Sequence, residues 1–130
     1  MLKIEKIAAI LKYQEEKNKL VMLVTGVELI PDEYKLDKHN INESFDNIVA
    51  RFESSSELGE ENCIHCASLI SEGIAFDSQC RGCIYYEKGN ECSKKDSLWR
   101  QASRIFREKA TIEEKSKLKN LGNQLVLDLK

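Results

Sequence analysis

Four of the five cysteines in this chain stand in two closely spaced pairs, Cys63 with Cys66 and Cys80 with Cys83. Two residues separate the members of each pair, and thirteen residues separate the pairs. This spacing lets one tight turn direct both sulfurs of a pair at a common point, and a second pair completes the tetrahedron that zinc prefers. The sequence therefore predicts a structural zinc site with these four ligands.

The fifth cysteine leaves the ligand set open. Cys92 follows the second pair across a segment that contains Gly89 and Asn90, and a turn there would bring it back towards the other sulfurs. A set of Cys80, Cys83 and Cys92 with one cysteine of the first pair is therefore an alternative. Cys92 can also be a small apolar side chain that is buried beside the site.

The two histidines are less favoured than the cysteines as zinc ligands. His65 lies inside the first pair, next to Cys66. Because the sulfur of Cys66 must already point at the ion, we expect the side chain of His65 to be exposed or to lie behind the ligands. His39 lies in a polar segment with no companion ligand at a suitable spacing, and we expect it at the surface.

Other chemistry at the cysteines is less well supported. An iron–sulfur cluster or a thiol redox centre is an alternative by residue type, but the close repeats of ferredoxins are missing. Zinc deaminases need His-x-Glu before Pro-Cys-x-x-Cys, whereas Gln79 precedes Cys80 here. A site of four sulfurs also leaves no open position for water or substrate. Metalloprotease, phosphate-loop and nucleophile-elbow motifs are absent, so we expect no enzymatic activity.

A basic segment follows the cysteines. Its three arginines, at spacings of four and three residues, share one face of a helix whose other face is apolar. Such a face is suited to phosphate binding, and the alternative is a surface that is solvated or paired within the protein. Two adjacent tyrosines can stack on bases or on a partner's side chains, or they can be half-buried beside the metal region. The candidate contact residues are Lys94, Lys95, Arg100, Arg104 and Arg107, with Tyr85 and Tyr86.

The composition is that of a soluble globular protein with one compact unit. The chain has 130 residues, of which 42% are hydrophobic and 32% are charged. Residues 1–62 carry 8 basic and 13 acidic side chains, a net of −5, and residues 63–130 carry 12 and 9, a net of +3. The two halves can attract each other, or the basic half can be a working surface.

The sequence also predicts where the protein resides. The apolar run at residues 20–24 is too short to span a membrane, and charges interrupt the N-terminal segment where a secretory signal would be apolar. We expect a cytoplasmic protein without membrane contact. In that compartment paired cysteines bind metals more often than they form disulfides.

Apolar spacing predicts the elements that position these residues. Residues 4–11 indicate a helix, with the run at 20–24 as its continuation or as a strand; residues 31–42 indicate a loop and residues 53–62 a linker. Residues 125–129 continue the last helix or form a short strand. A further helix opens with a capping box at Thr111 and Glu114. A possible cap at Asn42 precedes the second of the helical segments. The predicted inward positions of three successive helical segments are Ile4, Ile7, Ala8 and Leu11; Phe45, Ile48, Val49 and Phe52; and Leu98, Trp99, Ala102, Ile105 and Phe106.

These observations lead to one overall prediction. The protein is of the α+β class and mainly helical, with an N-terminal helical region at residues 1–57, a zinc-binding region at 58–95 and two helices at 96–130. Its predicted function is that of a small zinc-binding regulator that contacts nucleic acid through the basic helix. The alternative is a zinc-stabilised adaptor or inhibitor that binds another protein.

Overall fold

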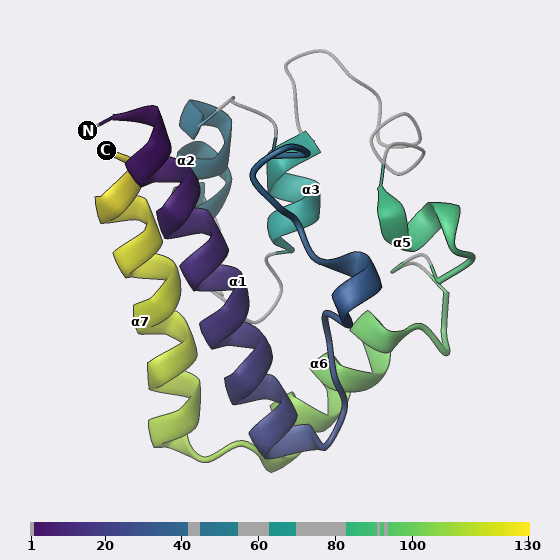
Figure 1. Ribbon diagram of the computed structural model, residues 1–130. Coiled ribbons are helices and arrows are strands. Elements are labelled where there is room, and N and C mark those ends of the chain that lie inside the picture. The colour runs from purple at the N-terminus through teal and green to yellow at the C-terminus, as the bar shows by residue number, and fades with distance from the viewer. Residues whose placement is uncertain (1, 42–44, 55–62, 70–82, 91, 93) are drawn as a thin grey trace.

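The structure, a computed structural model, describes residues 2–41, 45–54, 63–69, 83–90, 92 and 94–130 (Figure 1). The predicted cap Asn42, the ligand Cys80 and most of the linker lie outside the described residues. All regular structure in the described part is helical, so the prediction of a mainly helical protein is confirmed and its β component is wrong there. The helices are α1 (Lys3–Thr25), the 3-10 helix η1 (Asp32–Tyr34), α2 (Phe45–Ser54), α3 (Ile64–Leu69), α5 (Ile84–Glu87), α6 (Leu98–Lys109) and α7 (Ile112–Leu129).

The two longest helices, α1 and α7, form the backbone of the fold. They run antiparallel, with the N- and C-termini at the same end of the molecule (Figure 1). Helix α6 packs on α1, and α2 packs on both α7 and α3. Helices from the two ends of the chain therefore share one packing unit. No helix in the described part is long and apolar enough to cross a membrane.

Helix α1 continues through residues 20–24 as a single helix of 23 residues, which decides between the two predicted alternatives. It ends at Gly26, whose φ of +72° lies in the left-handed region. The N–H of Gly26 donates to the carbonyl of Met22 at 2.8 Å. Glycine adopts this conformation at little cost, and so it commonly ends helices.

The predicted inward stripe of α1 is confirmed only in part. Ile7 and Leu11 are partly buried against the core, but Ile4 is 76% exposed, and the fully buried side chains belong to a neighbouring stripe. That stripe mixes apolar with polar residues, which hides it from a search for apolar spacing. The buried side chains of α1 are Ile10, Tyr13, Gln14, Lys17, Asn18 and Val21.

Two buried amides explain why a polar stripe faces inward. Gln14 accepts from the N–H of Leu36 at 2.8 Å and donates to its carbonyl at 3.2 Å. Asn18 makes the same pair of bonds with Ile30, at 2.8 and 3.1 Å. The loop between α1 and α2 is thus held through its backbone. Buried polar groups are tolerated where they are hydrogen-bonded in this way.

The loop that these amides hold is part of the core. Its polar appearance in the sequence predicted a loop, and apart from η1 that prediction is confirmed. However, several of its side chains pack inward between α1 and the cysteine region. The buried ones are Leu29, Ile30, Tyr34, Leu36 and Ile41.

The remaining predicted helices form as expected. Helix α2 buries Ile48 and Phe52, and α6 buries Ala102 and Phe106. Ser97 caps α6, since its side chain accepts from the N–H of Arg100 at 3.2 Å. The buried positions of α2 and α6 follow directly from the apolar spacing in the sequence, whereas the cap at Ser97 was not predicted.

The last helix confirms the predicted capping box. The Thr111 hydroxyl accepts from the N–H of Glu114 at 3.1 Å, and the Glu114 carboxylate accepts from the N–H of Thr111 at 2.9 Å. Helix α7 then continues past Gly122 to Leu129, so the C-terminal segment is helical rather than a strand.

Candidate metal site and basic helix

Cys63 and Cys83 stand at the starts of α3 and α5, two short α-helices of six and four residues. Cys63 directly precedes α3, and its carbonyl accepts from the N–H of Ala67 at 3.0 Å. Cys83 is the N-cap of α5, and its carbonyl accepts from the N–H of Glu87 at 3.0 Å. One cysteine of each pair therefore begins a helical turn, where backbone N–H groups favour a thiolate.

The two sulfurs interact electrostatically. Burial is the largest effect on both groups, and it raises the pKa of Cys63 and of Cys83. Backbone N–H groups in the first turns of α3 and α5 oppose this rise. A thiolate at Cys63 raises the pKa of Cys83 further, so the two sulfurs lie within reach of each other's charge. Burial of both thiols and the repulsion between their charges therefore favour the protonated thiols.

Tyr85 lies at the centre of the cysteine region. Burial raises its pKa, and negative charge at Cys63, Cys83 or Cys92 raises it further. Its hydroxyl donates to the carbonyl of Leu29 at 2.8 Å, and its ring is only 3% exposed. Tyr85 is thus anchored to the loop after α1 and senses the charge of the cysteine thiols.

The burial of Tyr85 also corrects its predicted role as a stacking residue. Its ring stacks on Tyr34, with centroids 4.6 Å apart, and so it is not available to a base or a partner. The neighbouring Tyr86 is exposed and keeps its place as a candidate contact residue.

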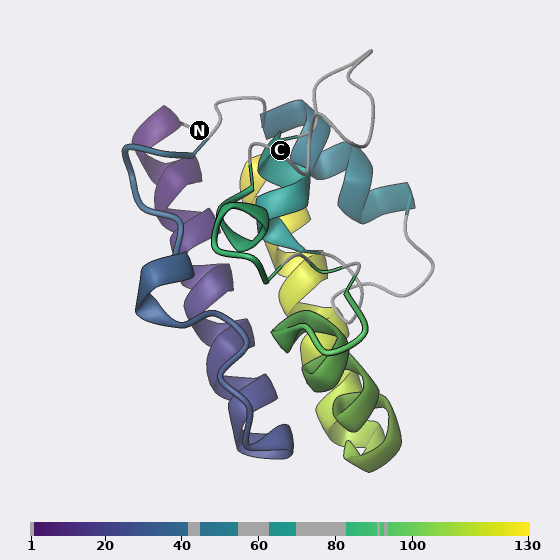
Figure 2. The same ribbon diagram turned by 90° about the vertical axis from the view of Figure 1, so that its right-hand side faces the viewer.

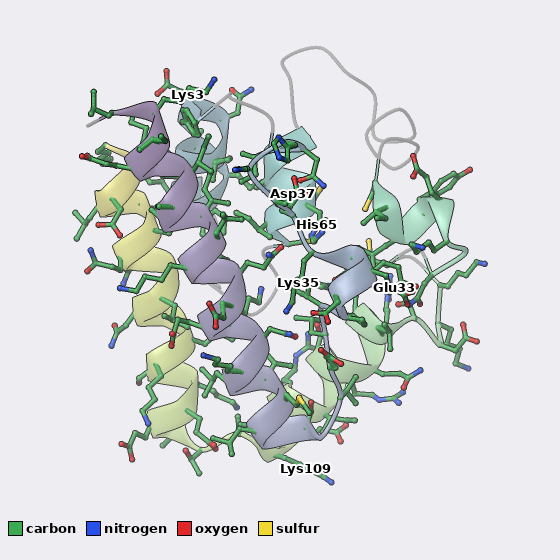
Figure 3. All side chains as sticks on the ribbon, viewed as in Figure 1. Lys3, Glu33, Lys35, Asp37, His65 and Lys109 are labelled. Atoms are coloured by element: carbon green, nitrogen blue, oxygen red, sulfur yellow. The ribbon has the colours of Figure 1, made fainter. Side chains whose placement is uncertain are left out.

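His65 is buried, so the exposed alternative is wrong and the alternative of a side chain behind the predicted ligands stays open. It lies in the first turn of α3 and points towards the segment that carries Glu33 and Lys35 (Figure 3). Its Nε2 hydrogen-bonds to the carbonyl of Tyr34, and its Nδ1 lies 3.8 Å from the sulfur of Cys63. Burial lowers the pKa of His65 to about 4, so its ring is neutral at physiological pH.

Lys17 is a charged neighbour of this region that the sequence interpretation missed. It is buried on α1, with its Nζ 4.7 Å from the centroid of the Trp99 ring and 5.8 Å from that of Tyr13. While burial raises the pKa of Cys63, the charge of Lys17 acts in the opposite direction. Its spacing of four from Tyr13 would have placed it on the inward face of α1, had that face been identified correctly.

Cys92 follows a turn, as the sequence predicted. Gly89 has a φ of +73°, and the N–H of Asn90 donates to the carbonyl of Tyr85 at 2.7 Å. Cys92 is exposed, so the alternative of a buried small apolar residue is wrong. Its carbonyl accepts from Nε of Arg100 at 3.0 Å, which ties this arm to α6.

The complete ligand set remains a prediction. None of the described cysteines, which are Cys63, Cys66, Cys83 and Cys92, forms a disulfide. Cys80 lies outside the described residues. Within the described part, no three histidine, cysteine or acidic side chains are grouped so that they could hold a metal ion by themselves.

The basic residues lie on one side of α6. All three arginines are exposed, whereas Ala102 and Phe106 on the other side are buried. Lys94 and Lys95 are exposed just before the helix, and Nζ of Lys94 donates to the carbonyl of Gly89 at 3.0 Å. Figure 2 shows α6 in front of the first half of α7. The arginines that share this face are Arg100, Arg104 and Arg107.

The chain matches no family model, no curated protein and no solved structure. The roles of the cysteines and of α6 are therefore inferred from the residues and their geometry.

Proposed function

We propose that this protein is a small, non-enzymatic zinc-binding regulator that contacts nucleic acid through α6. The observation that carries the proposal is the exposed arginine face of α6, opposite a side that is buried in the core. Such a helix is held rigidly while its guanidinium groups face outward. Arginine offers a fork of donors that matches phosphate oxygens, and each phosphate contact releases condensed counterions.

The proposed role of the zinc is to fix the segment that leads into α6. Helices α3 and α5 have six and four residues, well below the length at which a helix is stable alone. Each carries or adjoins a predicted ligand, so metal binding would add folding free energy where apolar burial is small. In this proposal the ligands are Cys63, Cys66, Cys80 and Cys83.

The connection from the cysteines to the basic face is direct. The turn at Gly89 follows α5, and Oδ1 of Asn90 accepts from the N–H of Leu98 at 3.2 Å. Arg100 contacts the carbonyl of Cys92 from the other side. Two contacts thus join the cysteine region to the first turn of α6, and a metal that orders this region would orient the arginines.

Fluorescence anisotropy with labelled DNA and RNA oligonucleotides tests the proposal. We expect binding that weakens steeply as salt rises, and a loss of about tenfold or more in affinity for the double variant Arg100→Glu/Arg104→Glu. Lys12→Glu/Lys38→Glu is the matched control, because it makes the same charge changes at exposed positions outside α6. An affinity that the α6 variant leaves unchanged, or no salt-sensitive binding at near-physiological salt, would refute nucleic-acid binding by this face.

One observation favours the second candidate, an adaptor that binds another protein. A groove of about 550 Å³ lies between α1 and α7, and Leu23 beside it is 78% exposed. Exposed apolar residues around a groove are typical of protein contact sites. If a protein is the partner, Leu23→Asp should abolish its binding and the α6 variant should not. The residues that line the groove are Glu16, Lys19, Leu20, Leu23, Lys117, Asn120, Leu121 and Gln124.

A further inference from the structure

We propose that the groove between α1 and α7 binds an amphipathic helix of a partner protein, with a basic residue at one end of its apolar face and an acidic residue at the other. The groove is a different surface from the arginine face of α6. The inference rests on the second candidate function and deepens it, because it names the class of partner that the adaptor binds.

The first argument is the shape of the groove. Its space of about 550 Å³ is lined only by side chains of α1 and α7, which run antiparallel and side by side (Figure 1). On each helix the lining residues recur at intervals of three and four, so each wall is a single helical face. A third helix packs on such a pair because its own rows of side chains have the same spacing. The walls are Glu16, Lys19, Leu20 and Leu23 on α1, and Lys117, Asn120, Leu121 and Gln124 on α7.

The second argument is the length of the groove. The wall on α1 extends from residue 16 to residue 23, and the wall on α7 from residue 117 to residue 124. At a rise of about 1.5 Å per residue, each wall is about 10 Å long, which is the length of about two helical turns. A helix that docks here therefore presents apolar side chains at positions i, i+3 or i+4, and i+7.

The third argument is the apolar floor of the groove. Leu20 and Leu121 are partly buried and pack against the core, whereas Leu23 beside them is 78% exposed. The apolar side chains of a docked helix extend the core over these leucines and remove Leu23 from water. Burial of such apolar surface is the main favourable contribution to a contact of this kind.

The fourth argument is the charge at the two ends of the groove. Since α1 and α7 run antiparallel, the start of one wall lies beside the end of the other, and Glu16 and Lys117 therefore stand at opposite ends. Both side chains are exposed, and among the described residues neither has an ion-pair partner. Lys19, the remaining charged residue of the walls, is paired with Glu15 at 3.0 Å. A partner helix complements this pattern with a basic residue near Glu16 and an acidic residue near Lys117.

Nuclear magnetic resonance of the isotope-labelled full chain, titrated with synthetic helical peptides, tests the proposal. Three peptides share leucines at positions i, i+3, i+4 and i+7 and differ only in their end residues, which are Lys and Glu, Lys at both ends, or Glu at both ends. We expect the Lys/Glu peptide to bind about threefold or more tightly than either of the others, with signal changes confined to the groove. Lys117→Glu should transfer the preference to the peptide with Lys at both ends.

A substitution on the floor of the groove tests the apolar contact. Leu23→Asp should weaken the binding of the Lys/Glu peptide by about tenfold or more, because it places an acidic group against the apolar face of the peptide. Leu127→Asp is the matched control, since Leu127 is 65% exposed on α7 and does not line the groove. Both leucines are exposed, so neither substitution disturbs the core.

Three results would overturn the proposal: unchanged groove signals at millimolar peptide, equal affinity for the three peptides, and a preference that Lys117→Glu leaves unchanged. Analytical ultracentrifugation of the free chain covers the other occupant. A homodimer that Leu23→Asp dissociates would overturn the partner helix and keep the groove as a protein contact. If neither a peptide nor a second copy binds the groove, the adaptor fails as well, whereas nucleic-acid binding by α6 is decided separately by Arg100→Glu/Arg104→Glu.

Discussion

The helical frame, made of α1, α2, α6 and α7, differs from the cysteine arm, made of residues 63–69, 83–90 and 92, in how each is stabilised. Helices α1 and α7 have 23 and 18 residues and bury extended faces, whereas α3 and α5 have six and four. The frame is held by apolar burial, which is roughly proportional to area. The arm depends on a few specific contacts of His65 and Tyr85 and, in our proposal, on a metal. Length decides between the two modes, because short helices cannot bury enough surface to hold themselves.

Metal removal should separate the two regions most clearly. Structural zinc contributes on the order of 10 kcal/mol to the folding of small zinc domains, so chelation in reducing buffer should affect the arm above all. We expect amide hydrogen exchange in α3 and α5 to accelerate by about 100-fold or more, while α1 and α7 keep their protection. Re-addition of zinc should restore the slow exchange. Equal exchange with and without metal would show that the arm needs no ion.

A core substitution should affect the frame instead. Phe106 is buried on α6 against side chains of α1 and α7, and Phe106→Ala should cost about 3 to 5 kcal/mol in the free energy of unfolding. Urea denaturation measures this loss. Ile112, which is 86% exposed, supplies the control, since Ile112→Ala should change stability by about 0.5 kcal/mol or less. A loss below about 1 kcal/mol for Phe106→Ala would contradict apolar burial as the main source of frame stability.

Acid should open the arm before it unfolds the frame. Burial lowers the pKa of His65 to about 4 in the folded protein, while an unfolded histidine takes up its proton near pH 6.5. The unfolded form binds more protons in this interval, so stability falls as the pH decreases from about 6.5 towards 4, by about 3 kcal/mol. Hydrogen exchange of the metal-free protein at several pH values measures the effect in α3. His65→Gln should remove this pH dependence, and an unchanged acid response in that variant would exclude His65 as its cause.

Loss of one buried amide should have the smallest of these effects. Asn18→Leu removes both partners of the Ile30 backbone, and each unsatisfied buried group costs about 1 to 3 kcal/mol. Partial access of water to the loosened loop should limit the total to about 2 kcal/mol. Asn120→Leu makes the same chemical change at an exposed position of α7 and should be nearly neutral. Equal denaturation midpoints for the two variants would show that the amide clamp does not stabilise the loop.

The sequence was informative wherever one short segment contains the whole signal. The capping box of Thr111 and Glu114, the buried face of α6 and the turn at Gly89 all depend on neighbours within a few residues. Propensity and periodicity act at that range, so these features could be predicted. The C-x2-C pairs belong to the same class of local signals, and their ligand set remains a prediction.

The sequence failed where a residue's environment comes from distant segments. Lys17 and Asn18 do not look like inward residues of α1, because their partners lie on the following loop and on α6. The same holds for Tyr85, for which the sequence left both a stacking role and half-buried packing open, and which is buried under the loop after α1. Polar residues face inward where another segment offers hydrogen-bond partners. The spacing of residues along one helix does not predict which partners another segment will offer.

The sequence by itself therefore determined a mainly helical chain, with paired thiols and an arginine stripe at fixed helical spacing. Only the tertiary structure decided which way His65 points. Its position between Ile64 and Cys66 suggests a side chain directed away from the metal, yet the carbonyl of Tyr34 holds its Nε2 and turns Nδ1 towards Cys63. The physical reason is that the hydrogen-bond partners of an imidazole decide its orientation and which of its nitrogens carries the hydrogen. Packing across the fold brings these partners together.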